Sequence, residues 1–456
     1  MKRVTAIGPV RRVLLCCPLA VAVTLVSPHS VWAEEGASAP TWSPAAYEHL
    51  ALENHPSLRA SHHAWQASVR EGEAARSRLA QPVLSYRAEI GTPWTDNPGL
   101  GHMVMLSQMI MWPSVLDAMA EPARVAAAVE RERFDAQTLA IVFDVRRALI
   151  EIARVDHHKE LIEEQRQYFQ DAIGIVEAGM ATGRAGYVDA LRLTLSSEML
   201  AERLDMLGRE REESLIELRA LLGLAAASPL GFDFHGDHDP TAVEEQPLEA
   251  APLVAAMLAH HPELRQMARE AEMARAMGLA SARSRRPSPM IGLGYSNMPA
   301  MAAGERQDAL LIELSVPIPL FGRQYDADVE RFESTRAAAL EQRTALQRTL
   351  TAGIEASVAR IDERLRRLQR YRIDLLPIAT DVSERLLAEI ELGRAMITDF
   401  QMAQQQQLDL AMMLVDLRAD IAIERARLTM LTGGHFKAHG AHGAPSITIE
   451  EIGGRP

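Results

Sequence analysis

The strongest constraint on the fold is a leucine pattern that runs through two very long helical regions. A sustained period of 3.5 residues predicts a coiled-coil seam, and good helix formers fill most of the remaining positions. Because a helix of about 50 residues is about 75 Å long, these regions predict long helices packed side by side. The 4-3 spacing runs through Leu200, Leu204, Leu207, Ser214, Leu218 and Leu221, with Arg211 off pattern, and through Leu410, Leu414, Leu417, Ile421, Leu428 and Leu431, with Glu424 off pattern.

Short motifs recur in the same order about 206 to 210 residues apart, which indicates a duplicated unit. The duplication predicts a first repeat over 43–228 and a second over 252–433, joined by a linker over 229–251. We also predict an export signal over 1–33, argued below, and a tail over 434–456. Each repeat is expected to begin with one helix, over Ser43–Leu79 and Leu248–Ser284. The recurring motifs are His55-Pro56-Ser57-Leu58 with His261-Pro262-Glu263-Leu264, Gly183-Arg184-Ala185 with Gly393-Arg394-Ala395, Asp189 with Asp399, and Leu221 and Gly223 with Leu431 and Gly433.

Between these helical parts, each repeat has two short runs with a period of two, which predicts strands. The runs are Val83–Ile90 and Met103–Met111 in the first repeat, and Met290–Ser296 and Asp308–Val316 in the second. Their length and alternation fit transmembrane β-strands, and they fit equally a soluble sheet with one buried face. Four strands cannot close a barrel, and lipid does not tolerate open sheet edges, so the membrane interpretation requires several chains.

The N-terminal residues resemble a cleavable export signal, with a basic start, an apolar run and Val31-Trp32-Ala33 before the expected cleavage point. Cys16 and Cys17, the only cysteines, would leave with it, and too little apolar sequence precedes Cys16 to favour lipidation. The net charge of −13 becomes four units more negative without residues 1–33, which argues against nucleic acid as a partner. No catalytic or phosphate-binding motif is present, so we expect neither an enzyme nor a cofactor.

Taken together, the chain resembles the TolC family of outer-membrane efflux proteins over residues 43–434. The resemblance rests on the duplicated order, on the two His-Pro-x-Leu motifs, on the segment Val316–Gly322 before a long helix, and on Leu376-Pro377 ahead of Gly393. It implies a mainly α-helical, homotrimeric protein with a small β part. Three chains would form a 12-stranded outer-membrane β-barrel and a long periplasmic α-barrel. The family's outer-membrane proteins are passive exit ducts that work with a periplasmic adaptor protein and an inner-membrane pump.

The resemblance also assigns roles to particular residues. The hairpin tips that would dock the adaptor are Gly183, Arg184 and Ala185 in the first repeat and Gly393, Arg394 and Ala395 in the second. A turn glycine with no docking role is the alternative for these tips. Asp189 and Asp399 follow the tips, and Asp399 stands where acidic residues of the family narrow the pore. Each Asp could instead be a solvated residue that the helix dipole favours.

The 21 methionines and 15 histidines raise the possibility of heavy-metal cargo, and the segment Val316–Gly322 is similar to the heavy-metal branch of the family. Soft Cu(I) suits methionine sulfur, but a methionine stripe is more often packing, and we expect no resident metal site. The candidate side chains are Met103, Met105, Met109 and Met111 on one strand, and His435, His439 and His442 in the tail.

Two other classes of protein stay open at this point. A periplasmic adaptor has a long helical hairpin, but it would need a β-rich domain at each end and would not duplicate the whole chain. A structural coiled-coil protein of the envelope would remain water-soluble, and its strands would tolerate charge on both faces.

Overall fold

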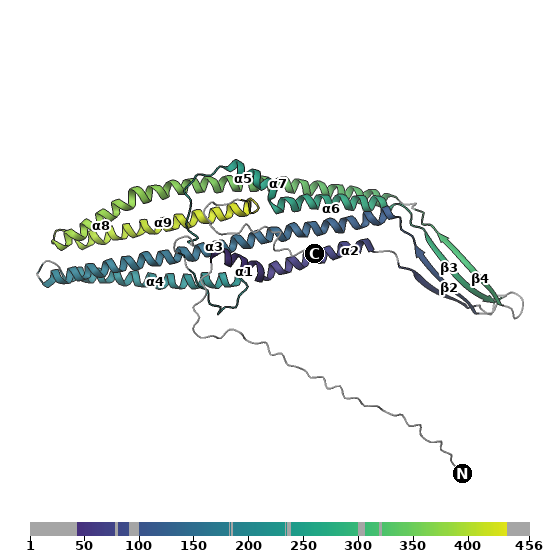
Figure 1. Ribbon diagram of the computed structural model, residues 1–456, viewed down its shortest axis with the longest axis horizontal. Coiled ribbons are helices and arrows are strands. Elements are labelled where there is room, and N and C mark those ends of the chain that lie inside the picture. Colours follow the sequence, from purple (N-terminus) through teal and green to yellow (C-terminus); the bar gives the residue numbers. More distant parts are fainter. Residues whose placement is uncertain are drawn as a thin grey trace, which may run out of the picture. The chain divides into compact units, whose positions relative to one another are not determined.

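The structure is a computed structural model, and it describes residues 43–77, 81–90, 100–181, 183, 186–232, 234, 239–299, 306–318 and 322–435. The predicted export signal, Arg184, Ala185 and the tail beyond His435 lie outside these residues. Within them the chain is mainly helical with four antiparallel strands, as expected (Figure 1).

The element order of the first half returns in the second half. Each half has two short helices, two strands, one very long helical segment and a return helix. The first half comprises α1 (Pro44–Asn54), α2 (Pro56–Ser77), β1 (Val83–Ile90), β2 (Leu100–Met109), α3 (Pro113–Ala181) and α4 (Tyr187–Leu221). The second comprises α5 (Ala250–His260), α6 (Pro262–Ser284), β3 (Met290–Pro299), β4 (Arg306–Ser315), α7 (Arg323–Arg370), the π-helical turn η2 (Tyr371–Leu375), α8 (Leu376–Glu391) and α9 (Ile397–Leu431).

One prediction was wrong in detail: the opening segment of each repeat is two helices and not one. The breaks fall at His55 and His261, whose backbones are extended at ψ near 120°. Proline follows each of these histidines, at Pro56 and Pro262. Proline disfavours helical geometry in the residue before it and supplies no N–H, so each helix must stop and a new one begins.

The recurring glycines pack against these breaks. Gly223 has φ +65°, and a Cβ added there would lie 2.7 Å from the carbonyl oxygen of Asn54. Gly433 has φ +70°, and its added Cβ would lie 2.7 Å from the carbonyl oxygen of His260. Two motifs far apart in the sequence are therefore the two sides of one backbone contact, made once in each half.

The four strands form one antiparallel sheet in the order β1-β2-β3-β4. The central pair joins the halves, with Leu106 opposite Leu293 and Val104 opposite Tyr295. Within the described ranges, both outer strands, β1 and β4, have a neighbour on one side only. The sheet thus has two open edges, one from each half.

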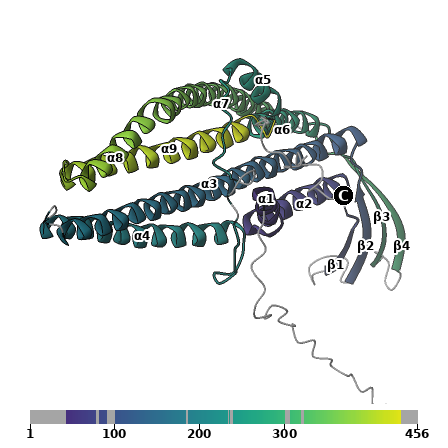
Figure 2. The same cartoon turned by 60° about the vertical axis from the view of Figure 1, so that its left-hand side comes forward.

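The helices continue this order away from the sheet (Figures 1 and 2). Next to the strands, α2, α3, α6 and α7 each contact the next; farther away, α4 contacts α3, α3 contacts α9, and α9 contacts α8. We call β1, α2 and α4 the first flank, and β4, α7 and α8 the second flank. The 69-residue helix α3 is about 100 Å long and lies in both rows.

Four apolar clusters hold the described helices together. One lies within each half, the third joins α3 and α4 to α9 across the halves, and a small fourth also joins α3 to α9. Phe400 is fully buried in the third cluster and meets Phe169 edge to face at 6.1 Å. The two repeats therefore share a core, as the side-by-side packing predicted from the leucine pattern requires.

The segment between the repeats packs onto both of them. Tyr47 Oη in α1 donates a 2.7 Å hydrogen bond to the carbonyl oxygen of Gly231, and Asp239 lies 3.4 Å from His157 of α3. The Arg425 guanidinium of α9 donates to the carbonyl oxygen of Glu244. These described parts of the linker bind the surface of the helices.

A π-helical turn lies just before Leu376-Pro377, one of the motifs on which the resemblance rests. The backbone N–H of Leu376 reaches back five residues to the carbonyl oxygen of Tyr371. Pro377 follows, and it cannot supply the N–H that the carbonyl oxygen of Ile373 would otherwise accept. The helical hydrogen-bond pattern therefore changes from i→i−4 to i→i−5 beside this proline, between α7 and α8.

Candidate functional site

Both hairpin ends lie at the ends of the long helices away from the sheet (Figure 1). Gly183 has φ +73° between α3 and α4, and Gly393 has φ +68° between α8 and α9. At the second end, the backbone N–H of Gly393 donates to the carbonyl oxygen of Ile390, and that of Arg394 donates to Glu389. Both bonds satisfy carbonyl groups at the end of α8, and this geometry is one that glycine adopts without strain.

Asp189 occupies the first turn of α4, where it serves its own helix. Its carboxylate accepts a 3.3 Å hydrogen bond from the backbone N–H of Gly186 and lies 4.0 Å from the Arg192 guanidinium. Its side chain is 33% exposed. Asp189 therefore has a local structural reason to be acidic, since a carboxylate at this position satisfies a free N–H and the helix dipole.

Asp399 has the corresponding position in α9 but different surroundings. Its backbone N–H donates to the carbonyl oxygen of Met396. Its side chain is exposed, and among the described residues we find no hydrogen bond or ion pair to the carboxylate. The two acids that the sequence treated as equivalent are therefore different, and only Asp399 presents an unengaged charge.

Exposed apolar side chains surround the hairpin ends, and the sequence analysis did not identify them. Helix α4 exposes Val188, Leu191, Leu195 and Met199 at spacings of three and four residues, which place them on one face. The sequence contains a signal for these side chains, because α4 has a second row of apolar residues beside its leucine seam. Apolar residues on two faces are typical of a helix that packs on both sides.

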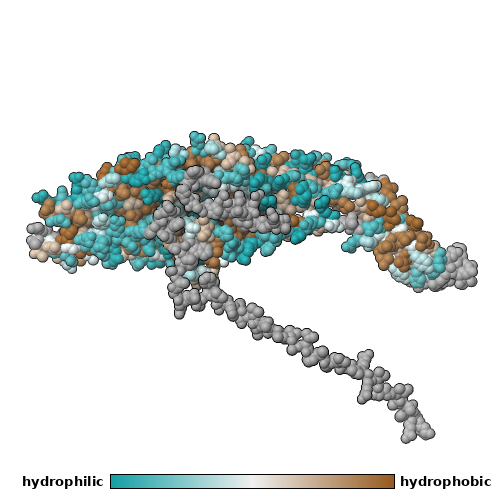
Figure 3. All heavy atoms as spheres, viewed as in Figure 1, coloured by the Kyte–Doolittle hydropathy of each residue, from teal (hydrophilic) through white to brown (hydrophobic). Residues whose placement is uncertain are grey.

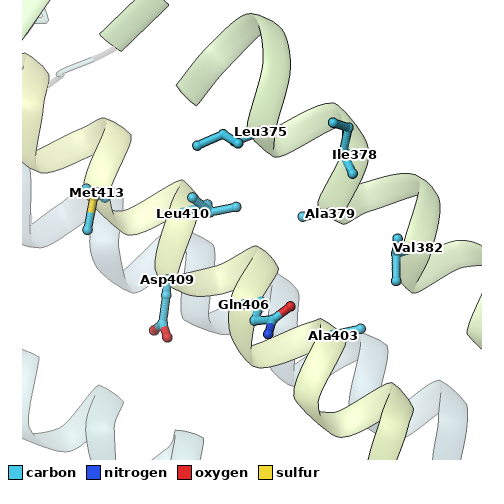
Figure 4. Close-up of a pocket in the computed structure, with 9 residues that line it drawn as sticks. All are labelled: Leu375, Ile378, Ala379, Val382, Ala403, Gln406, Asp409, Leu410 and Met413. Carbon is cyan, nitrogen blue, oxygen red and sulfur yellow. The ribbon is translucent and has the colours of Figure 1, made fainter. Parts of the chain in front are cut away.

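The second flank has a matching apolar surface in the form of an open pocket between α8 and α9 (Figure 4). Its volume is about 440 Å³, and Ile378 and Val382 on one wall are exposed. Asp409 and Gln406 are its only side chains with polar groups. The lining residues are Leu375, Ile378, Ala379, Val382, Ala403, Gln406, Asp409, Leu410 and Met413.

One face of the sheet is a continuous apolar surface. Because strand residues directly opposite each other lie on the same face, the register aligns the even-numbered residues of β1, β2 and β4 with the odd-numbered residues of β3. Leu310 is 73% and Ile312 79% exposed. One row is Leu84-Leu106-Leu293-Ile312, and the next is Tyr86-Val104-Tyr295-Leu310.

A polar row limits this surface on the side away from the helices. The Tyr86 hydroxyl lies 2.6 Å from His102 Nδ1, and the Tyr295 hydroxyl donates to Asp308 at 2.7 Å. Figure 3 shows the apolar band next to the helices and hydrophilic residues beyond it. Tyrosines at such a boundary resemble the aromatic girdles of outer-membrane proteins.

The opposite face contains the methionine stripe, and there Met105 is a packing residue. Its sulfur lies 3.4 Å from the position of a Cβ on Gly292, and its terminal carbon 3.4 Å from that of a Cβ on Gly294. The missing side chains of the two glycines leave the space that this methionine fills. Met111 lies beyond the end of β2. This geometry favours the packing interpretation.

Among the described residues, no group of three or more His, Cys, Asp or Glu side chains is arranged to hold a metal ion. His435 stacks on His260 with ring centroids 3.7 Å apart. His439 and His442 lie outside the described residues. In the described part of the chain, none of the helices is long and apolar enough to cross a membrane.

Comparison with known proteins finds a family match in the first repeat. Residues 48–224 match the family described as "Outer membrane efflux protein". Together with the fold, this match identifies the chain as an outer-membrane efflux channel that extends into the periplasm, a non-enzymatic transport protein. No curated protein sequence matches it.

Solved structures support the same fold for this efflux channel. CusC, described in terms of folding and transmembrane channel formation, is 15% identical with a TM-score of 0.71, over 88% of this chain and 96% of the other. The outer membrane protein VceC of Vibrio cholerae is 16% identical with a TM-score of 0.69, over 86% and 97%. The outer membrane channel CmeC of Campylobacter jejuni is 14% identical with a TM-score of 0.68, over 92% and 93%.

Proposed function

We propose that three copies of this efflux channel close into one duct. The observation that carries this proposal is the pair of open flanks. Both sheet edges end in strands whose exposed face is apolar, and unpaired strand edges are not tolerated in lipid. A contact between the first flank of one copy and the second flank of the next repeats around an axis and closes a ring. With four strands per chain, three copies supply twelve, enough for a closed barrel.

The helical parts of the flanks support the same pairing. The exposed row on α4, from Val188 to Met199, belongs to the first flank, and the apolar pocket beside α8 belongs to the second. Each is a surface that monomeric proteins rarely expose to water. Burying one against the other would extend the leucine seams of each chain into a ring of helices.

The hairpin ends are proposed to dock a periplasmic adaptor that connects the duct to an inner-membrane pump. Gly183 and Gly393 allow close approach of a partner backbone, and Arg394 offers an exposed charge beside the second turn. Leu392 and Met396 are exposed at the same turn. Arg184 and Ala185 are included in this proposal only because the Gly-Arg-Ala motif occurs in both repeats.

Asp399 is proposed to form the pore constriction, with Asp189 in a structural role. Three copies of an unengaged exposed carboxylate would make a ring that repels anions and attracts cations. Asp189 is bound to its own helix N-terminus and is the weaker candidate. Met402, one turn after Asp399, is exposed and uncharged, so the ring would have one carboxylate per chain.

We further propose heavy-metal cations as the cargo. The segment Val316–Gly322 and the content of 21 methionines and 15 histidines support this choice. Because Met105 is a packing residue, it does not support metal binding, and the proposed cargo depends mainly on the similarity of Val316–Gly322 to the heavy-metal branch.

A complementation assay tests these assignments together. We expect wild-type protein to restore resistance to copper, silver or zinc salts in a strain lacking it, with little change toward lipophilic drugs. Arg394→Glu should abolish the resistance while normal amounts reach the outer membrane. Arg418→Glu, a charge reversal at an exposed residue of α9 outside both flanks, is the control.

Two outcomes would contradict the assignments. Restored drug resistance without metal resistance would contradict the metal cargo, and full activity of Arg394→Glu would contradict the assignment of this tip as the docking point.

A separate measurement tests the constriction. Asp399→Ala should raise antibiotic entry into cells more than Asp189→Ala does. Equal effects of the two substitutions would overturn the choice between them.

A further inference from the structure

The apolar face of the sheet continues past the last paired strand residues toward the helices. Ile110 and Trp112 follow β2, and Val316 and Ile318 follow β4; all four are exposed, Trp112 by 49% and Ile318 by 75%. From Leu310 to Ile318 the chain advances about 27 Å, or about 21 Å along the membrane normal at a strand tilt near 40°. This distance is close to the thickness of an outer-membrane apolar band, so Trp112 and Ile318 lie at its periplasmic boundary.

Trp112 is fixed at this boundary by a hydrogen bond. Its Nε1–H donates to the carbonyl oxygen of Pro287 at 2.9 Å. An indole that is tied to the backbone at one edge and half exposed presents an apolar ring at a constant height. Tryptophan is enriched at such positions because its ring suits the level of lipid headgroups.

Four arginines lie directly on the helix side of Trp112. Arg283, Arg285 and Arg286 end α6 and begin the connection to β3, and Arg323 begins α7. All four are exposed. Of the carboxylates nearest in sequence to this junction, Asp326 lies 3.3 Å from Arg285, and Asp117 is one turn farther into α3. The cluster therefore has more guanidinium groups than carboxylates to neutralise them.

Most donors of these arginines remain available. Arg283 and Arg286 each donate one hydrogen bond to Ser114, to its carbonyl oxygen at 3.2 Å and its hydroxyl at 3.1 Å. Among the described residues no ion pair involves Arg323. A guanidinium has five N–H donors arranged for planar, bidentate contact with phosphate.

We propose that this cluster binds the phosphate headgroup of an anionic phospholipid of the periplasmic leaflet. The arginines supply the charge, Trp112 lies at headgroup level, and the adjoining exposed apolar surface of Ile110, Val316 and Ile318 receives the acyl chains. A free phosphate would use only the arginines. The direct continuation of the arginine cluster into exposed apolar surface selects a lipid as the ligand.

The test measures lipid retained by the full-length protein. Protein purified from its membrane would be equilibrated with mixed micelles containing phosphatidylcholine and phosphatidylglycerol, and the bound lipid would be counted by mass spectrometry. We expect selective retention of phosphatidylglycerol. The triple variant Arg285→Gln, Arg286→Gln, Arg323→Gln should bind it roughly a hundredfold more weakly, since each arginine near a membrane surface contributes about a fivefold factor.

Matched variants make the result specific. Arg147 of α3 and Arg418 and Arg427 of α9 are three exposed arginines outside both flanks, and their triple change to glutamine should leave retention unchanged. The single variant Arg323→Gln disturbs no hydrogen bond or ion pair that we find among the described residues, and we expect about a fivefold loss even where the triple variant folds poorly. Equal phosphatidylglycerol retention in wild type and both Arg323 variants would overturn the proposal. Displacement of the lipid by millimolar inorganic phosphate would overturn the lipid as ligand.

Discussion

At the residue scale, one contact explains two of the repeated motifs, the His-Pro-x-Leu segment and the glycine that closes each half. Gly223 and Gly433 both have positive φ, and both lie against the backbone where a proline has ended a helix. A side chain at either position would be strained by its own backbone and would overlap a carbonyl oxygen. The duplicated sequence thus preserves a backbone contact, and not a binding site, at these positions.

Gly433→Ala should lower the free energy of unfolding by about 1–3 kcal/mol from backbone conformation alone, with a further loss from the 2.7 Å overlap. Gly208→Ala in α4 is the matched control. No atom lies within 4 Å of its added Cβ, and alanine is a better helix former, so a gain of up to about 1 kcal/mol is expected. Thermal unfolding followed by circular dichroism compares them. A stable Gly433→Ala protein would contradict the role of this contact.

His261 makes the stability of the fold depend on pH. Burial, and then the Arg265 charge, lower the pKa of His261 from 6.5 to about 4, and its Nδ1 has no hydrogen-bond partner. The unfolded chain therefore takes up a proton below about pH 6.5 that the folded chain refuses until about pH 4. As pH falls through that window, the contribution of His261 to the free energy of unfolding is lost. The full loss is about 3 kcal/mol.

His261→Asn should remove this loss, so its unfolding temperature should fall less than that of wild type between pH 7.5 and pH 4.5. Asp135 acts in the opposite direction, because burial raises the pKa of its carboxyl to about 6 and its protonation on acidification favours the fold. Both proteins contain Asp135, so the difference between them isolates His261. Asparagine at the exposed His49 is the control. Parallel pH profiles for all three proteins would rule out the assignment.

At the element scale, the sequence predicted the strands and long helices because their periodicities are strong and local. β1 begins and ends as expected, and the other three strands differ by a few residues. The split of each opening helix was missed although Pro56 and Pro262 were visible, because the motif was treated only as a sign of repetition. The different surroundings of Asp189 and Asp399 could not be predicted, since they depend on how the Gly186 backbone turns.

The apolar face of the sheet makes a direct prediction for membrane insertion. Ile312 lies in the middle rows of that face, and Ile312→Lys should cost about 2–4 kcal/mol in lipid. Much less protein should then reach the outer membrane, as measured by immunoblot of urea-washed membranes. The neighbouring Glu313→Lys changes the charge on the opposite face and should insert normally. Equal yields would mean that lipid does not cover this face.

At the scale of the whole molecule, the repeated order of elements leaves one open flank on each side. Each half contributes one strand and a row of helices to an open flank, and the central β2–β3 pair joins the halves. Sequence predicted the duplication and the number of strands. It did not predict that the apolar row on α4 and the pocket beside α8 lie on opposite flanks, because this depends on the order in which the helices pack.

The mass of the protein extracted from separated membranes tests this account most directly. The full chain, with its own N-terminal residues, would be expressed in a Gram-negative host, and the outer-membrane fraction would be dissolved in mild detergent. We expect a complex of three copies of the 50.2 kDa chain, less any removed signal, found only in that fraction. A monomer in the soluble periplasm would contradict the account, because both flanks and the apolar sheet face would then be exposed to water.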